Sequence, residues 1–437
     1  MTDFSSIDPQ SMATQLAGFD VQALQKQLKT QQGTLTAQKN ALRALKTTLS
    51  DFRTALQGLN KTNAGMLKTS ASVSVENRVS VTTTSEARKG TYNLFVEQLA
   101  SSHQVAFDSL TDDAVSQASG SMSITINGKS IDVDMDSVDS LAGLAKAING
   151  AQDNPGVTAS LVRTGGQVRM MLSSDKSGAE NAIQLGGSVP AAMSDSASVR
   201  TISRAQDAVV WLGEKGNGLQ VTSSTNTFSN LIDGVTLELN QAQGAAETPL
   251  RIDIGVDTKQ TEEQMKTFVD AYNKLLGALG TLTASGSGST ERGALAGDAS
   301  ISNLRRDMNQ MLRSVSEGLD ITQFGLSADK DGKLKLDNDK LADMLAEDPG
   351  KLNGFFNGSN GLLRKMDKSL DKYLSVTDGV IKNREETFRR RENELTDRSD
   401  KITTRYDNAY NRYLSQFTRL QSVMQQMNST ANMFGLV

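Results

Sequence analysis

The 437-residue chain has no cysteine, a single histidine (His103) and few aromatic residues, which make up 5% of it. Without cysteine there can be no disulfide, no cysteine-ligated zinc or iron–sulfur centre and no thiol nucleophile. One histidine is too few for a histidine cluster that binds a metal, and we expect His103 to be an ordinary packing or surface residue. These absences remove many of the side chains that commonly carry catalysis.

Long apolar runs and a surplus of basic residues are missing too. No stretch approaches the roughly 18 apolar residues of a membrane span, so membrane insertion is not expected. The net charge of −4 and the pI near 5.4 argue against a nucleic-acid-binding protein, which normally presents a basic face. The N-terminus has no Lys or Arg before Lys26 and no apolar stretch, so a cleaved secretory signal is not expected either.

The sequence offers no motif for catalysis, cofactor binding or metal binding. Asp329, Asp331 and Gly332 resemble part of a calcium loop, but the twelfth position of that loop would be Asn338 instead of a bidentate Glu. An Asp-Gly pair ahead of a short alternating segment is typical of a β-hairpin turn. The predicted sets of catalytic, cofactor-binding and metal-ligating residues are therefore empty, and we expect a protein that is not an enzyme.

What the chain does have is apolar residues at heptad spacing near both ends. Such a repeat places an apolar stripe along one side of a helix, which partner helices have to cover. We therefore predict that the two terminal helices pair with each other and with copies of the chain, along a seam interrupted at Gln31 and Gln38. The predicted self-assembly seam consists of Leu24, Leu28, Leu35, Leu42, Leu45, Leu49, Phe52, Leu56, Tyr413, Phe417, Leu420, Met424, Met427 and Phe434.

The middle of the chain follows a different pattern, with short alternating segments that are typical of strands. Residues 124–133 (ITINGKSIDV) predict a hairpin around Asn127-Gly128, and residues 157–172 predict another around Gly165-Gly166. The predicted fold class is α+β with several domains. Both termini are expected to form a long antiparallel helical or coiled-coil stalk, with β-rich head domains inserted between them.

Changes of pattern place the domain boundaries. The polar, Ser-rich residues 1–20, with Gly18, are expected to be mobile, and the first long helix is expected to run from about Val21 to about Leu67. A break in the last helix is expected at Asp378-Gly379. The predicted parts are an N-terminal mobile segment and stalk helix (1–67), the first part of a head domain (68–103), an inserted β-rich outer head domain (104–203), the second part of the head domain (204–257), a helical leg domain (258–378) and a C-terminal stalk helix (379–437).

The basic run at residues 389–391 is interpreted as a solvated helix face instead of a nucleic-acid contact. Glutamates stand four residues before three of the nearby arginines, an orientation that favours ion pairs within one helix. The expected pairs are Glu385 with Arg389, Glu386 with Arg390 and Glu394 with Arg398.

Several stretches resemble one protein family in the order in which they occur. They are residues 90–100 (GTYNLFVEQLA), 224–239 (STNTFSNLIDGVTLEL), 268–273 (FVDAYN) with 295–298 (LAGD), 324–334 (FGLSADKDGKL), and the tail from 412–417 (RYLSQF) to 424–430 (MQQMNST). Together they are similar to the flagellar filament cap proteins, the flagellar hook-associated protein 2 family. The hairpin at 124–128 and the helix after it resemble a module that recurs in flagellar axial proteins.

The resemblance implies a secreted, non-enzymatic assembly factor at the distal tip of the bacterial flagellar filament. It implies export through the flagellar type III apparatus without a cleaved signal peptide, and a ring-shaped homo-oligomer, often a pentamer in the family. The partners that it implies are flagellin, which the cap helps to insert and fold, a hook–filament junction protein and a flagellar export chaperone. No cofactor, nucleic acid or membrane is implied.

Two other functions remain open at this stage. A hook–filament junction protein also has helical termini around a β-rich middle. A surface adhesin that binds host glycans would use the head, residues 70–257. An enzyme is disfavoured because no acid–base constellation is present.

Overall fold

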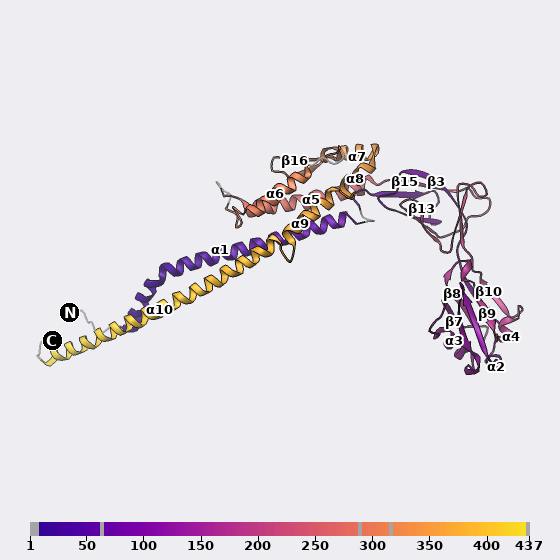
Figure 1. Cartoon of the computed structure of the whole chain (residues 1–437), viewed down its shortest axis with the longest axis horizontal. Coiled ribbons are helices and arrows are strands. Elements are labelled where there is room, and N and C mark those ends of the chain that lie inside the picture. The colour runs from indigo at the N-terminus through magenta and orange to yellow at the C-terminus, as the bar shows by residue number, and fades with distance from the viewer. Residues whose placement is uncertain (1–7, 62–64, 287–290, 314–317, 434–437) are drawn as a thin grey trace. The chain divides into compact units, whose positions relative to one another are not determined.

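The computed structural model describes residues 8–61, 65–286, 291–313 and 318–433, and the chain folds into two compact units. Residues 62–260 form one unit, here called the head unit. Residues 1–61 and 261–437 form the other, here called the leg unit. The helices lie mainly in the leg unit and the strands mainly in the head unit, which confirms the predicted α+β class with helical ends and a β-rich middle (Figure 1).

The helices are bounded as follows. They are α1 (Pro9–Leu59), α2 (Asp112–Ser116), η2 (Met135–Ser137), α3 (Leu141–Asn149), η3 (Ala179–Asn181), α4 (Ala191–Ser194), α5 (Thr258–Thr283), α6 (Ala299–Leu312), η4 (Ile321–Phe324), α7 (Asn338–Glu347), α8 (Pro349–Asn357), α9 (Leu362–Leu374) and α10 (Val380–Met433), where η marks a 3₁₀-helix.

The strands are shorter. They are β1 (Thr69–Val73), β2 (Val79–Thr83), β3 (Gly90–Gln98), β4 (Ser102–Phe107), β5 (Ser121–Ile126), β6 (Lys129–Asp134), β7 (Val157–Thr164), β8 (Gln167–Ser177), β9 (Gln184–Gly187), β10 (Val199–Ser203), β11 (Ala208–Leu212), β12 (Leu219–Ser223), β13 (Thr227–Ile232), β14 (Val235–Leu239), β15 (Leu250–Val256), β16 (Leu326–Ala328) and β17 (Leu334–Leu336).

The head unit contains two hydrophobic cores. In the first, a five-stranded sheet (β1-β15-β3-β11-β12) shares a core with a three-stranded sheet (β13-β14-β2). In the second, a four-stranded sheet (β10-β4-β8-β7), a three-stranded sheet (β6-β5-β9) and α3 enclose buried residues between Val105 and Met193. The strands β3 and β11 are neighbours in the first sheet, and the chain between them builds the second core. The six-part division of the chain given above stays a prediction.

Local signals explain the hairpins. At the turn between β5 and β6, Asn127 and Gly128 both have positive φ, 48° and 71°, as a type I′ turn requires. Gly165 and Gly166 do the same between β7 and β8, with φ of 59° and 79°. Both predicted hairpins are confirmed, because their turn residues relieve the steric penalty that other residues pay at positive φ.

The first helix begins earlier and ends earlier than expected. Asp8 caps α1, since its carboxylate accepts hydrogen bonds of 3.1 Å from the backbone N–H groups of Gln10 and Ser11, and Pro9 occupies the first helical position. The expected start at Val21 is therefore wrong, and so is mobility of the described residues up to 20. Gly18 is accommodated inside the helix, which ends at Leu59 instead of Leu67.

The leg unit packs around aromatic side chains. Phe268 and Tyr272 of α5 are fully buried, and Phe268 contacts Phe356 of α8 with ring centroids 5.7 Å apart. The next residue, Asn273, uses its amide to donate to the backbone oxygen of Leu334 and to accept from its N–H, at 2.9 and 2.8 Å. The FVDAYN motif thus supplies two core rings and one amide that satisfies the backbone of β17.

Candidate assembly interface

The predicted seam of α1 forms a continuous buried stripe. Its members are buried except Leu24, which is half-buried. The buried residues are Leu28, Leu35, Leu42, Leu45, Leu49, Phe52 and Leu56. Towards the start of the helix, Leu28 packs with Ile402 of α10, and the half-buried Leu24 joins them. Towards its end, the ring of Phe52 lies 6.3 Å from that of Tyr272 in an edge-to-face contact. In the single chain, α1 is thus covered by other helices of the leg unit.

The facing stripe of α10 was missed by the sequence reasoning. It consists of Ile381, Phe388, Ile402 and Ala409, which are buried, and Leu395, which is half-buried. These residues repeat at intervals of seven, which is the signal that could have identified them. The expectation concentrated on the more apolar residues after Tyr406 and passed over a stripe that begins 25 residues earlier.

The predicted C-terminal seam residues are only partly covered. Tyr413, Phe417 and Met424 are half-buried, whereas the side chains of Leu420 and Met427 are 45% and 66% exposed. Phe434 lies outside the described residues. The apolar surface near the end of α10 is therefore open to solvent in the single chain, and its burial between copies stays a prediction.

Ion pairs cross between α1 and α10 and show that the two helices run antiparallel. Lys39 pairs with Glu392 at 2.8 Å and Lys46 with Glu385 at 3.0 Å. Nearer the start of α1, Asp20 pairs with Arg412 at 3.0 Å. Pairs this exposed contribute about 0–1 kcal/mol each, so we assign them to the register of the helices more than to stability. Figure 1 shows the two helices following each other along their length.

The expected ion pairs within α10 are absent from the described residues. Glu385 pairs with Lys46 of α1 instead. Arg398 donates to the side-chain oxygens of Gln27 and Gln31, also on α1, at 2.6 and 3.1 Å. The prediction was wrong because it considered only charges within α10 and not those of the helix it pairs with. A partner helix at the seam offers its own charged and amide groups.

A second feature of α10 also went unnoticed in the sequence. Arginine recurs every seven residues, six times in succession, and these six residues are here called the arginine ladder. They are Arg384, Arg391, Arg398, Arg405, Arg412 and Arg419. Because seven residues are close to two helical turns, successive members of the ladder leave the helix within about 20° of each other.

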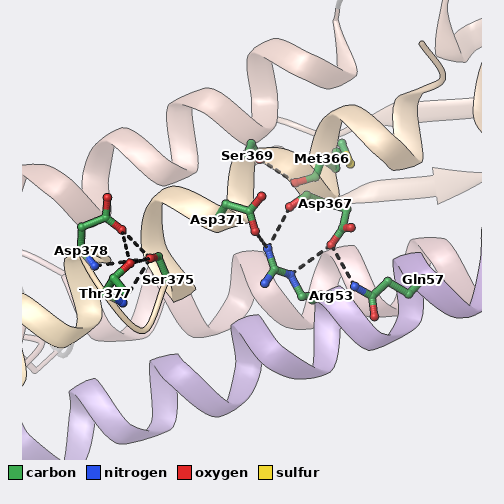
Figure 2. A network of polar contacts seen from close by, with 9 residues as sticks. All are labelled: Arg53, Gln57, Met366, Asp367, Ser369, Asp371, Ser375, Thr377 and Asp378. Carbon is green, nitrogen blue, oxygen red and sulfur yellow. Dashed lines mark hydrogen bonds and ion pairs between the residues drawn. The ribbon is translucent and has the colours of Figure 1, made fainter. Parts of the chain in front are cut away.

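Arg53 joins α1 to α9. Its guanidinium pairs with Asp367 at 3.0 Å, also contacts the carboxylate of Asp371, and donates to the backbone oxygen of Asp367 at 3.2 Å (Figure 2). The Arg53 side chain is only 24% exposed. This network fastens the last turns of α1 to the leg unit.

The turn between α9 and α10 has its own polar network, also shown in Figure 2. The Ser375 and Thr377 hydroxyls hydrogen-bond to the Asp378 carboxylate and hold its pKa below the ordinary value. At Gly379 a Cβ would stand 2.4 Å from the backbone oxygen of Ser375, closer than any side chain tolerates. The predicted helix break at Asp378-Gly379 is confirmed, and the close approach of the backbone explains it.

His103 lies on β4 in the head unit. It is partly buried, and its Nδ1 accepts a hydrogen bond of 2.9 Å from the backbone N–H of Ile183. Burial lowers the pKa of this imidazole. Nδ1 can accept this hydrogen bond only when it carries no proton.

Across the described ranges no group of three or more acidic or histidine side chains is arranged to hold a metal ion. None of the helices in those ranges combines the length and apolarity that a membrane span needs. The features that stand out are helix faces, charge series and an open apolar end, which are features of an interface.

Three family profiles match the chain. Those described as the N-terminus and C-terminus of flagellar hook-associated protein 2 match residues 5–103 and 205–429, and the flagellin hook IN motif matches residues 121–176. The profile matches divide the chain at the same place as the insertion between β3 and β11.

Known proteins agree with these matches. The lateral flagellar hook-associated protein 2 of Vibrio parahaemolyticus is 37% identical over 99% of this chain and all of its own length. The A-type flagellar hook-associated protein 2 of Pseudomonas aeruginosa is 29% identical over 72% of this chain and 71% of its own. The crystal structure of domains D1–D2–D3 of the Escherichia coli flagellar cap protein covers 79% of this chain and 98% of its own, with a TM-score of 0.66 and 28% identity. This chain belongs to the flagellar hook-associated protein 2 family, the family of flagellar filament cap proteins.

Proposed function

We propose that the protein caps the distal end of the bacterial flagellar filament and promotes the insertion and folding of exported flagellin. The observation that carries this proposal is the match to a lateral flagellar hook-associated protein 2 over the whole of both chains.

The same proposal includes its partners. The chain assembles into a ring with copies of itself, contacts flagellin at the filament end, and has a hook–filament junction protein as a further partner. It reaches the tip through the flagellar type III export apparatus, held beforehand by an export chaperone. Support for self-assembly comes from the open apolar end of α10, where Leu420 and Met427 are exposed in the single chain.

We further propose that the cap serves a lateral flagellum. The polar flagellar hook-associated protein 2 of Vibrio parahaemolyticus aligns with only 38% of this chain and 26% of its own length, at 29% identity. The lateral protein of the same organism aligns from end to end. Alignment from end to end indicates that this chain has the same set of domains as the lateral protein. This supports a cap for the same type of filament.

The test is deletion of the gene in its host, with flagellin assayed in the medium and filaments counted by electron microscopy. The proposal predicts unpolymerised flagellin in the medium, bare hooks, and recovery of filaments when the purified protein is added. Filaments of normal number and length on the mutant would reject it, together with the junction alternative. Immunogold labelling at the filament tip, instead of at its base, separates a cap from a junction protein.

An adhesin that binds host glycans through the head is a weaker alternative, because the matched proteins are named for the flagellum. It would be favoured only if cells that lack the gene kept their filaments and lost attachment to mucin.

A further inference from the structure

The arginine ladder occupies an unusual place in a two-helix stalk. Arg398 and Arg412 reach across to α1, where they meet Gln27 and Asp20. The ladder therefore runs along the border of the apolar seam, where a coiled coil normally places residues that interact with a neighbouring helix. From Arg384 to Arg419 it extends roughly 50 Å at the ordinary helical rise.

Members of the ladder alternate between paired and unpaired. Arg384 pairs with Asp298, and Arg398 hydrogen-bonds to Gln27 and Gln31. Arg412 pairs with Asp20. The intervening Arg391, Arg405 and Arg419 are exposed and have no ion pair or hydrogen bond with another residue in the described part of the chain. Two successive unpaired members, Arg391 and Arg405, are 14 residues apart. The single chain thus satisfies half of a regular series.

An open cavity lies beside the ladder, between the two helices of the stalk. A cavity of about 470 Å³ opens between α1 and α10, and its walls include Gln31, Gln38, Arg391 and Arg398. Glu394 is the one carboxylate among its lining residues. Arg398 is already bonded to Gln27 and Gln31, whereas the guanidinium of Arg391 has no partner among the described residues. Arg391 therefore suits the carboxylate of an incoming side chain, because arginine binds carboxylates in a planar, bidentate manner.

Complementary groups lie elsewhere on the same helix. Asp400 and Asp407 are exposed, are seven residues apart, and make no side-chain ion pair or hydrogen bond within the described ranges. They leave α10 about half a turn away from the ladder. The basic series and the acidic series therefore share one period and occupy different faces, which permits a head-to-tail contact in which the ladder of one copy meets the acidic face of the next.

We infer that the arginine ladder is the docking surface for a second copy of this chain, and that the carboxylates of Asp400 and Asp407 on the α10 of that copy are its ligands. The inference rests on the proposed cap function, because a ring with rotational symmetry places all stalks in the same direction. Since both series repeat every seven residues, a single axial stagger places Asp400 and Asp407 opposite two successive members of the ladder, one of them unpaired in its own chain. Pairs of this kind select the partner and its register more than they add affinity.

A charge exchange in the full-length protein tests the inference. The ladder variant is Arg391→Glu with Arg405→Glu, and the acidic-face variant is Asp400→Arg with Asp407→Arg. None of the four side chains has an ion pair or hydrogen bond among the described residues, so both variants are expected to keep the helix content and the melting temperature of the wild type. The control is Arg389→Glu with Arg390→Glu, the same charge change on the same helix outside the ladder.

Sedimentation velocity over a range of concentrations and salt then reads out self-association. We expect each charge variant alone to associate at least tenfold more weakly than the wild type, and the control to associate normally. Mixing the two variants in equal amounts should restore association, because the Glu-substituted ladder then meets the Arg-substituted face, and the unchanged ladder of the second variant meets the unchanged acidic face of the first. The association of the wild type should weaken as salt rises from 0.05 to about 0.5 M, as expected for exposed charges.

Three results would overturn the inference: unchanged association of the ladder variant, no recovery on mixing, or a wild type that stays monomeric at every concentration. Capping is scored separately, by adding each protein to cells that lack the gene and counting filaments. A ladder variant that associates and caps normally refutes the ladder and leaves the cap function standing. A wild type that associates through the ladder but restores no filaments refutes the cap function instead.

Discussion

The inner and outer halves of α1 carry the same leucine spacing but have different surroundings. The inner half, from Leu42 to Leu59, is buried in the leg unit, with Phe52 against Tyr272 and Arg53 bound to Asp367. The outer half, from Pro9 to Leu35, has α10 as its partner, and polar residues interrupt its seam. The comparison teaches that a heptad pattern predicts a stripe that must be covered, but not what covers it.

A charged residue placed in the seam of each half of α1 should lower the free energy of unfolding by different amounts. Leu42 is 2% exposed, so Leu42→Asp would bury an unpaired carboxylate and is expected to lower the free energy of unfolding by about 4 kcal/mol. Leu28, in the seam of the outer half, is 7% exposed but packs in a small cluster with Ile402 and the half-buried Leu24, so Leu28→Asp should cost clearly less. Urea unfolding followed by circular dichroism measures both. Equal destabilisation by the two substitutions would contradict the distinction between the halves.

Truncation of a core ring tests how firmly the inner half is anchored. Phe52→Ala removes a fully buried ring that contacts Tyr272, and an expected loss of about 3–5 kcal/mol follows from the cavity it leaves. The matched change on the outer half is Leu24→Ala, at a half-buried position. It should cost clearly less, and thermal unfolding of the two variants side by side gives the ranking.

The network around Arg53 should contribute a smaller amount. Arg53→Met keeps the aliphatic packing but removes the pairs with Asp367 and Asp371, for an expected loss of about 1 kcal/mol after allowance for solvent screening. Arg43→Met is the control, because Arg43 is exposed and its hydrogen bond goes to Asn40 of its own helix. If both variants unfold at the same urea concentration, the network does not fasten α1 to α9.

The smallest expected effect concerns the head unit and pH. Burial lowers the pKa of His103, so the unfolded chain, whose histidine pKa is about 6.5, binds the proton more readily than the folded one. Stability should therefore fall as the pH drops below about 6.5 and on through the folded-state pKa. His103→Asn keeps an acceptor for the N–H of Ile183 but does not titrate. Calorimetry between pH 7.5 and 5.5 should show a weaker pH dependence in this variant, and an identical dependence would exclude His103 as the cause.

Much of the fold could be predicted because its signals are local. Asn127-Gly128 specifies a turn through its own backbone preferences, and Gly379 marks a break because only a hydrogen fits there. The signal for the start of α1 is also local, in Asp8 and Pro9. The expected start at Val21 rested instead on Gly18, which was taken to interrupt the helix. One glycine within a long helix costs only about 1 kcal/mol, which the packing of that helix outweighs.

The assembly interface was harder to predict because its partners are distant in the sequence. Arg53 meets residues more than 300 positions away, and no local pattern at Arg53 announces them. The buried stripe of α10 and the arginine ladder did have a signal, a strict interval of seven. It was overlooked because Phe388 and Leu395 stand among charged residues, which lower the apparent amphipathicity of that stretch.

The most direct test of the account is whether the open end of α10 is where copies meet at the filament tip. The variant is Leu420→Asp with Met427→Asp, at side chains already exposed in the single chain, so the fold should be kept. The control is Val376→Asp, an exposed apolar residue in the turn before α10. Each purified protein is added to cells that lack the gene, and filaments are counted by electron microscopy. The account predicts that the wild type and the control restore filaments and that the double variant, although folded, does not; restoration by the double variant would contradict it.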